Sequence, residues 1–176
     1  MIRREYRVYE RMQDIAGVPV CYGLKDGEHL MLEYVEGRSL REAQRELRDR
    51  DAFFRSLLEL ILTLHGVGVA HADMKRKDNI LVTPDERPYL IDFGTAVLRH
   101  VDGGFLNRFI FGQACRIDLN AWVKLKYQRQ SSEIAGPDRA YYRPTAVERI
   151  ARLFRRGYRK LTARHWRKAR RRTSAD

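Results

Sequence analysis

Hydrophobic positions recur at helical spacing in several parts of the chain. Over residues 2–15 an apolar stripe is flanked by arginines and glutamates, and Gly17 ends the helix that the stripe predicts. Residues 51–65 carry a broader apolar face, which is typical of a helix buried in a core. A charged segment over 39–49 opens on a capping-box pattern and predicts a surface helix. Residues 118–125 predict a further helix with an acid at its N-terminus.

Short apolar runs separated by turn residues predict two pairs of strands. The first pair, 18–23 and 29–35, flanks a Lys-Asp-Gly turn. The second pair, 79–82 and 89–91, flanks a Pro-Asp-Glu turn and predicts a hairpin. Together with the helices, these strands place the chain in the α+β class.

Three polar side chains are expected at one end of this second hairpin. Asp73 lies in the loop that enters the first strand, Asn79 at the start of that strand, and Asp92 at the exit of the second. Two oxygen ligands beside a free carboxylate suit Mg²⁺, which keeps several waters and binds phosphate oxygens through one or two protein carboxylates. The sequence therefore predicts a site for magnesium and phosphate oxygens.

These residues stand in two motifs, His-Ala-Asp-Met-Lys-Arg-Lys-Asp-Asn at 71–79 and Asp-Phe-Gly at 92–94. The pair resembles the catalytic loop and the metal loop of the protein-kinase-like phosphotransferases. The wording His-Ala-Asp-Met-Lys is most similar to the bacterial lipopolysaccharide-core (Kdo/heptose) kinases and to RIO-like small kinases. The resemblance implies a protein-kinase-like fold with ATP and Mg²⁺ as cofactors.

The same resemblance implies roles for single residues. Asp73 would orient or deprotonate the acceptor hydroxyl, and Lys75 would reach the transferring phosphate. His71 would brace the loop, while Asn79 and Asp92 would hold the metal ion.

One spacing departs from the usual kinase pattern. Asn79 follows Asp73 by six positions instead of five, which leaves Asp78 as an alternative metal ligand.

The resemblance also assigns residues that would contact the nucleotide. Glu5 is the candidate for the ion-pairing glutamate of the small-lobe helix, with Glu10 second, although both also fit solvated helix charges. The segment Met-Leu-Glu-Tyr-Val-Glu-Gly resembles the hinge between kinase lobes. There the backbone of Glu33 and Val35 would hydrogen-bond adenine.

The resemblance divides the chain into three parts. Residues 1–36 are expected to be a remnant of the small lobe, 37–138 the mainly helical large lobe with the catalytic hairpin, and 139–176 a basic amphipathic tail. The 176 residues contain no Gly-x-Gly-x-x-Gly motif and no strand before Glu5 that could carry the phosphate-binding lysine. The interpretations left open are a start further upstream, a reduced family member, or a protein that no longer transfers phosphate.

Charge is concentrated in the tail. The whole formal net charge of +12 lies in residues 139–176. This segment holds 14 Lys or Arg against 2 Asp or Glu. Apolar residues at helical spacing make 147–172 a candidate for an anionic membrane surface. Docking of the apolar stripe on the domain's own core is the interpretation placed ahead of the membrane, and nucleic acid is a weaker alternative.

The cysteines and the hydropathy pattern set the expected compartment. Cys21 and Cys115 suggest neither a disulfide framework nor a metal knuckle, which fits a reducing cytosol. Neither a secretory signal nor a membrane span is apparent. A cytoplasmic location is expected, with peripheral contact at the inner membrane face as an extension of it.

The leading functional hypothesis is an ATP- and Mg²⁺-dependent phosphotransferase. By the resemblance, it would transfer the γ-phosphate to a hydroxyl of a lipopolysaccharide-core sugar or of protein serine or threonine. The alternatives are a pseudokinase scaffold that binds a membrane or partner through its basic tail, an RNA-associated kinase relative, and an aminoglycoside-type small-molecule kinase.

Overall fold

The structure is a computed structural model that describes residues 2–128, 134 and 136–143. The chain divides after Arg143 into two units, and the second, 144–176, lies outside the described residues. The predicted basic helix over 147–172 therefore lies outside them too. Among the described residues, no helix combines the length and the apolar character that crossing a membrane requires.

The described part of the chain mixes helices and short strands, as the sequence predicts. Its α-helices are α1 (Ile2–Arg11), α2 (Leu40–Ala43), α3 (Arg50–Gly66) and α4 (Gly104–Lys126). Its strands are β1 (Cys21–Lys25), β2 (His29–Leu32), β3 (Arg38–Ser39), β4 (Val69–Ala70), β5 (Ile80–Val82), β6 (Pro88–Leu90) and β7 (Val97–Leu98). Two 3₁₀ turns are described, η1 (Lys77–Asn79) and η3 (Asp138–Tyr141).

The strands form three small antiparallel sheets. β1 pairs with β2, β3 joins the β5–β6 hairpin, and β4 pairs with β7. In the central hairpin Ile80 lies opposite Leu90 and Val82 opposite Pro88. This register confirms the predicted second hairpin and brings the segment before β5 next to the segment after β6.

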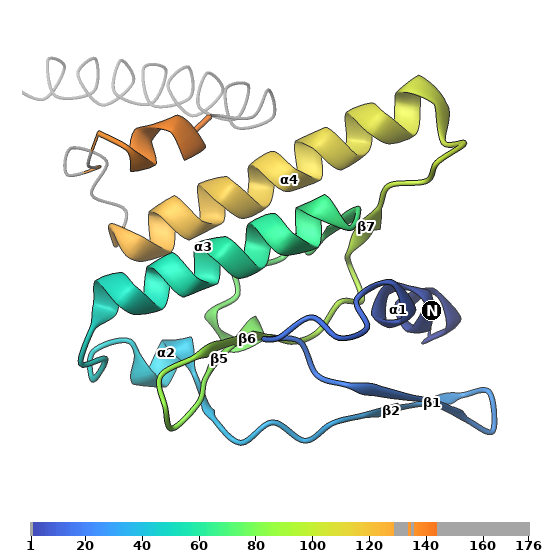
Figure 1. The fold of residues 1–176 in the computed structure, drawn as a ribbon, viewed down its shortest axis with the longest axis horizontal. Coiled ribbons are helices and arrows are strands. Elements are labelled where there is room, and N and C mark those ends of the chain that lie inside the picture. Colours follow the sequence, from blue (N-terminus) through green and yellow to red (C-terminus); the bar gives the residue numbers. More distant parts are fainter. Residues whose placement is uncertain (1, 129–133, 135, 144–176) are drawn as a thin grey trace, which may run out of the picture. The chain divides into compact units, whose positions relative to one another are not determined.

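The core lies around α3, which runs antiparallel to α4 along most of its length (Figure 1). Leu57, Ile61 and Leu64 of α3 are fully buried, so the prediction of a core helix over 51–65 is confirmed. The indole nitrogen of Trp122 on α4 donates a hydrogen bond to the carbonyl oxygen of Phe54 at 2.7 Å. That bond gives a buried polar atom its partner at the helix interface.

Three predicted helix boundaries are wrong. α1 ends at Arg11 rather than residue 15, since the following turn needs left-handed backbone, with φ of 65° at Asp14 and 92° at Gly17. Gly17 has no room for a side chain, because an added Cβ would lie 2.7 Å from a methyl group of Leu60.

α2 is also much shorter than predicted. The capping interaction exists, because the hydroxyl oxygen of Ser39 accepts a hydrogen bond from the Glu42 amide at 3.4 Å. The helix nevertheless ends at Ala43, since residues 44–49 turn back to begin α3. The third wrong boundary is the start of α4. This helix begins at Gly104, so Asp118 is an interior residue of α4 and not its N-cap.

Candidate active site

Four hydrogen bonds link the catalytic-loop candidates into a closed ring. The Asp73 amide donates to His71 Nδ1 at 3.3 Å, and His71 Nε2 contacts the Ile91 carbonyl oxygen at 3.0 Å. The Ile91 amide donates to the Asn79 carbonyl oxygen at 3.0 Å, and Asn79 Nδ2 donates to the Asp73 carbonyl oxygen at 3.2 Å. The ring brings Asp73 and Asn79 next to the residue that precedes Asp92.

The two contacts of the His71 imidazole in this ring select one of its tautomers. It accepts through Nδ1 and lies against a carbonyl oxygen at Nε2, so the geometry requires the neutral imidazole with its proton on Nε2. The side chain is 1% exposed. His71 thus lies between the loop of Asp73 and the entrance to the Asp92 turn.

Asp118 of α4 holds the loop from the other side. Its carboxylate accepts the amide hydrogen bonds of His71 and Ala72, both at 2.8 Å, and lies 3.1 Å from His65 Nε2. Ala72 has a φ of 65°, a left-handed conformation that costs an L-residue about 1–2 kcal/mol. Two charge-assisted hydrogen bonds at this point compensate for the strained backbone.

Phe93 connects the metal loop to the first helix. Its ring packs against His71, with centroids 4.7 Å apart, and edge-to-face against Tyr9 of α1 at 5.4 Å. The Tyr9 hydroxyl is buried without a hydrogen-bond partner among the described residues, and burial raises the pKa of that group. The stack fixes the position of α1 relative to the Asp92 turn.

Glu5 reaches this turn from α1. One of its carboxylate oxygens lies 3.9 Å from the point where a Cβ on Gly94 would stand. Burial raises the pKa of Glu5, the nearby Asp92 carboxylate raises it further, and the Phe93 amide opposes both effects. No Lys or Arg of the described residues forms an ion pair with Glu5, so two like charges face each other across the turn.

Replacing Glu5 with glutamine tests this repulsion. Because the folded state raises the pKa of Glu5, stabilisation from its protonated form is present below the unfolded pKa and is lost as pH rises through the raised value. We expect Glu5→Gln to be more stable than the unchanged chain at neutral pH and equal to it in acid. Urea unfolding across pH without nucleotide or metal measures the difference, with Glu10→Gln on the same helix as control. A Glu5→Gln protein less stable at neutral pH would contradict this.

The donor set of the metal-site candidates fits magnesium. Asp92 is exposed and has a φ of 63°, which turns it out of the strand direction at the exit of β6. Asn79 donates through Nδ2, and no hydrogen bond within the described residues engages its amide oxygen. A carboxylate and an amide oxygen are hard ligands of the kind Mg²⁺ takes. No group of three or more His, Cys, Asp or Glu among the described residues could hold a metal by itself.

Asp78, the alternative metal ligand, is engaged elsewhere. Both of its carboxylate oxygens accept hydrogen bonds of 2.7 Å from Arg41, at an exposed position. Asn79, in contrast, belongs to the ring around Asp73. These contacts favour Asn79 over Asp78 as the candidate metal ligand, although Asn79 follows Asp73 by one residue more than in the usual kinase pattern.

The cation nearest Asp73 is one that the sequence interpretation did not single out. Arg76 Nε lies 3.7 Å from a carboxylate oxygen of Asp73, whereas Lys75 is exposed to solvent. An arginine three residues after an acid within a tight loop is a pattern that could have suggested this pair.

The hinge candidates lie in the segment after β2. The Glu33 amide donates to the Val20 carbonyl oxygen at 2.8 Å, and the Glu33 carboxylate accepts from the Val20 amide at 3.0 Å. The Glu33 carbonyl oxygen and the Val35 amide and carbonyl groups have no hydrogen bond within the described residues. These backbone groups are therefore left to solvent or to a ligand.

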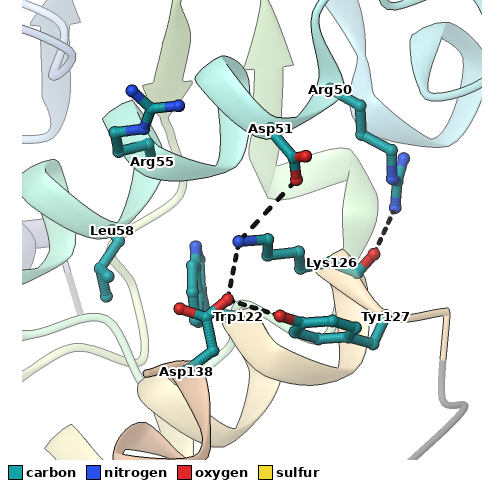
Figure 2. Close-up of a pocket in the computed structure, with 8 residues that line it drawn as sticks. All are labelled: Arg50, Asp51, Arg55, Leu58, Trp122, Lys126, Tyr127 and Asp138. Carbon is teal, nitrogen blue, oxygen red and sulfur yellow. Dashed lines mark hydrogen bonds and ion pairs between the residues drawn. The ribbon is translucent and has the colours of Figure 1, made fainter. Parts of the chain in front are cut away.

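A cavity of about 570 Å³ lies apart from these residues (Figure 2). Lys126 projects into it between Asp51, at 3.9 Å, and Asp138, at 2.7 Å. Burial alone raises the pKa of Asp138, but hydrogen bonds from Lys126 and Tyr127 bring it below its ordinary range. The lining is Arg50, Asp51, Arg55, Leu58, Trp122, Lys126, Tyr127 and Asp138. Three of these side chains are basic and two are acidic, and none of the candidate catalytic residues is among them.

The hairpin and the stacked Phe93 lie within the part of the chain that matches a known family. The family model of the RIO domain matches residues 1–108. The chain therefore belongs to the RIO domain family.

Curated relatives are serine/threonine-protein kinases. Over 117 residues, 62% of this chain, it is 33% identical to the serine/threonine-protein kinase cds1 of Schizosaccharomyces pombe and covers 25% of that protein. Over 102 residues, 54% of this chain, it is 33% identical to the serine/threonine-protein kinase PknH of Mycobacterium bovis and covers 17% of it. Over 75 residues, 42% of this chain, it is 37% identical to the serine/threonine-protein kinase D of Synechocystis and covers 15% of it. The chain spans about a quarter or less of the length of these relatives.

Proposed function

We propose that this protein is a phosphotransferase that moves the γ-phosphate of ATP to a hydroxyl group. The observation that carries the proposal is the hydrogen-bonded ring through Asp73, His71, Ile91 and Asn79. It holds the loop of Asp73 against Asn79 and against the residue that precedes Asp92, which suits phosphoryl transfer by positioning and charge neutralisation.

Each residue of the site has a part in this reaction. Asp73 accepts or orients the proton of the attacking hydroxyl, and the ring to His71 keeps its carboxylate in place. Asp92 and Asn79 hold Mg²⁺, which when bound neutralises charge on the phosphates. The carbonyl oxygen of Glu33 and the amide of Val35 bind the adenine edge.

Lys75 and Arg76 supply positive charge beside Asp73. Lys75 is exposed and close in sequence to the acid, which suits contact with the transferring phosphate. Arg76 moderates the negative charge of Asp73 itself.

Two observations favour two different classes of acceptor hydroxyl. The printed names of the relatives favour a serine or threonine hydroxyl on a protein. The wording His-Ala-Asp-Met-Lys favours a sugar hydroxyl of the lipopolysaccharide core. Turnover with radiolabelled ATP on a generic basic protein and on core oligosaccharide separates the two.

Nucleotide binding is the direct test of the site. We expect Mg-ATP to raise the Tm, because a ligand at a hundredfold excess over its Kd stabilises the folded state by about 2.7 kcal/mol, which is several degrees for a chain of this size. Asp92→Ala removes the metal carboxylate and should abolish the rise. Asp85→Ala, an exposed acid in the β5–β6 turn, serves as the matched control and should keep it. A Tm that does not respond to millimolar Mg-ATP would contradict the proposal and favour the scaffold interpretation.

A further inference from the structure

The start of α4 presents large apolar side chains to solvent. Five of them, called here the apolar tip, lie on the loop before the helix and on its first two turns. Their exposed fractions run from 98% to 46%, and they are Val101, Phe105, Leu106, Phe109 and Ile110. In Figure 1 these first turns of α4 extend beyond the end of α3. Contiguous exposed apolar side chains of this kind mark an interaction surface.

The tip is held firmly at its base. The Asn107 side chain accepts a hydrogen bond from the His100 amide at 2.9 Å and donates to the Leu98 carbonyl oxygen at 3.1 Å. The Arg99 amide donates to the Gly68 carbonyl oxygen at 2.8 Å. Gly103 lies so close to Asn107 that an added Cβ would stand 2.5 Å from its amide oxygen. The loop thus keeps the apolar side chains pointing away from the core.

Basic residues outnumber acidic ones in the segment that carries the tip. Between residues 99 and 116 the chain carries Arg99, Arg108 and Arg116 against the single acid Asp102. All three arginines are exposed. An apolar stripe flanked by exposed arginines complements a surface that is both apolar and negatively charged.

This charge distribution distinguishes three partners that could cover the tip: the basic tail, a second copy of the chain and a lipid bilayer. The tail after residue 139 carries 14 basic residues and 2 acidic ones, so it does not complement the arginines around the tip. A symmetric contact with a second copy would pair the patch with itself and bring the arginines of both copies into one interface. An anionic lipid bilayer offers apolar chains beneath negative headgroups and suits both features.

We propose that the apolar tip docks on an anionic lipid bilayer. Phe105 and Phe109, whose rings stack 6.4 Å apart, enter the boundary between headgroups and acyl chains. Arg99 and Arg108 contact the lipid phosphates. The proposal does not rest on phosphotransfer, and its test needs neither nucleotide nor metal.

Vesicle sedimentation tests the docking with the full chain. The probes are vesicles of phosphatidylcholine alone and of phosphatidylcholine mixed with phosphatidylglycerol. We expect binding to the mixed vesicles only, weakened by added salt. Phe105→Gln combined with Phe109→Gln should lower the partition coefficient about tenfold, because both rings lose burial in the bilayer. Tyr22→Gln removes a comparably exposed ring on β1 and is the matched control, with no change expected.

A reporter at the tip distinguishes this contact from one made by the basic tail. Phe109→Trp places an indole at the tip, and lipids with brominated acyl chains should quench the fluorescence beyond the quenching of the unchanged chain. If the double glutamine variant binds as well as the unchanged chain, or if the new indole is not quenched, the proposal is wrong. A dimer by analytical ultracentrifugation that the double variant abolishes would assign the tip to a second copy and overturn it.

Discussion

Replacing Asp73 with asparagine is expected to lower phosphate transfer from Mg-ATP by about 10²- to 10⁴-fold, the range that loss of a positioned acid–base group costs. The amide keeps the shape of the side chain but cannot accept the proton of the attacking hydroxyl. The ring itself should survive, because His71 and Asn79 bond to the backbone amide and carbonyl of Asp73 and not to its carboxylate. Nucleotide binding and folding should therefore stay near those of the unchanged chain.

Two measurements separate this outcome from a structural one. The Tm of Asp73→Asn with and without Mg-ATP should match the unchanged chain while turnover falls. Asp85→Asn removes the same charge from the exposed β5–β6 turn and should leave turnover intact. Equal turnover in Asp73→Asn and the unchanged chain would remove Asp73 from the chemistry.

The part of the site that sequence alone predicts is the part built from local structure. β5 and β6 are adjacent in the chain, and a short turn with alternating burial fixes their pairing, so the approach of Asn79 to Ile91, the residue before Asp92, follows from the hairpin. The buried α3 is predicted for the same reason, because its apolar face is continuous over the whole helix. In both cases the pattern and the packing agree.

What sequence could not predict depends on contacts between distant segments. The pair between Arg41 and Asp78, the alternative metal ligand, joins α2 to the loop before β5. The packing of Tyr9 on Phe93 joins residues more than eighty positions apart. No local pattern encodes such contacts, because they exist only once α1 and the hairpin have packed.

The start of α4 illustrates a second limit. Gly103 and Gly104 resemble a loop in sequence, and the apolar side chains that follow lack the polar face of an ordinary surface helix. In the structure α4 begins at Gly104 and includes the apolar residues that follow it. The Asn107 side chain is hydrogen-bonded back to the loop before the helix. A helix whose first turns expose apolar residues departs from the amphipathic rule, and such departures are expected at functional surfaces.

Asp118→Ala is expected to destabilise the fold by about 3–5 kcal/mol, the largest effect on stability foreseen here. The substitution leaves the amides of His71 and Ala72 buried without acceptors, each at a cost of about 1–3 kcal/mol. It also releases the left-handed backbone of Ala72, which the two bonds hold in place. Urea unfolding measures the loss, and Asp102→Ala, an exposed acid before α4, should change stability by less than about 0.5 kcal/mol.

The asparagine variant shows why the carboxylate itself is needed. Asp118 accepts at both oxygens, so an amide in its place must turn its NH₂ group toward either His71 or Ala72 and lose one backbone bond. If the NH₂ group lies toward His71, His65 can accept from it by changing tautomer, and the Ala72 bond survives. Asp118→Asn should therefore cost about 1–3 kcal/mol, less than alanine. Equal losses in the two variants would mean that packing in α4, and not the tether to the strained loop, accounts for the effect.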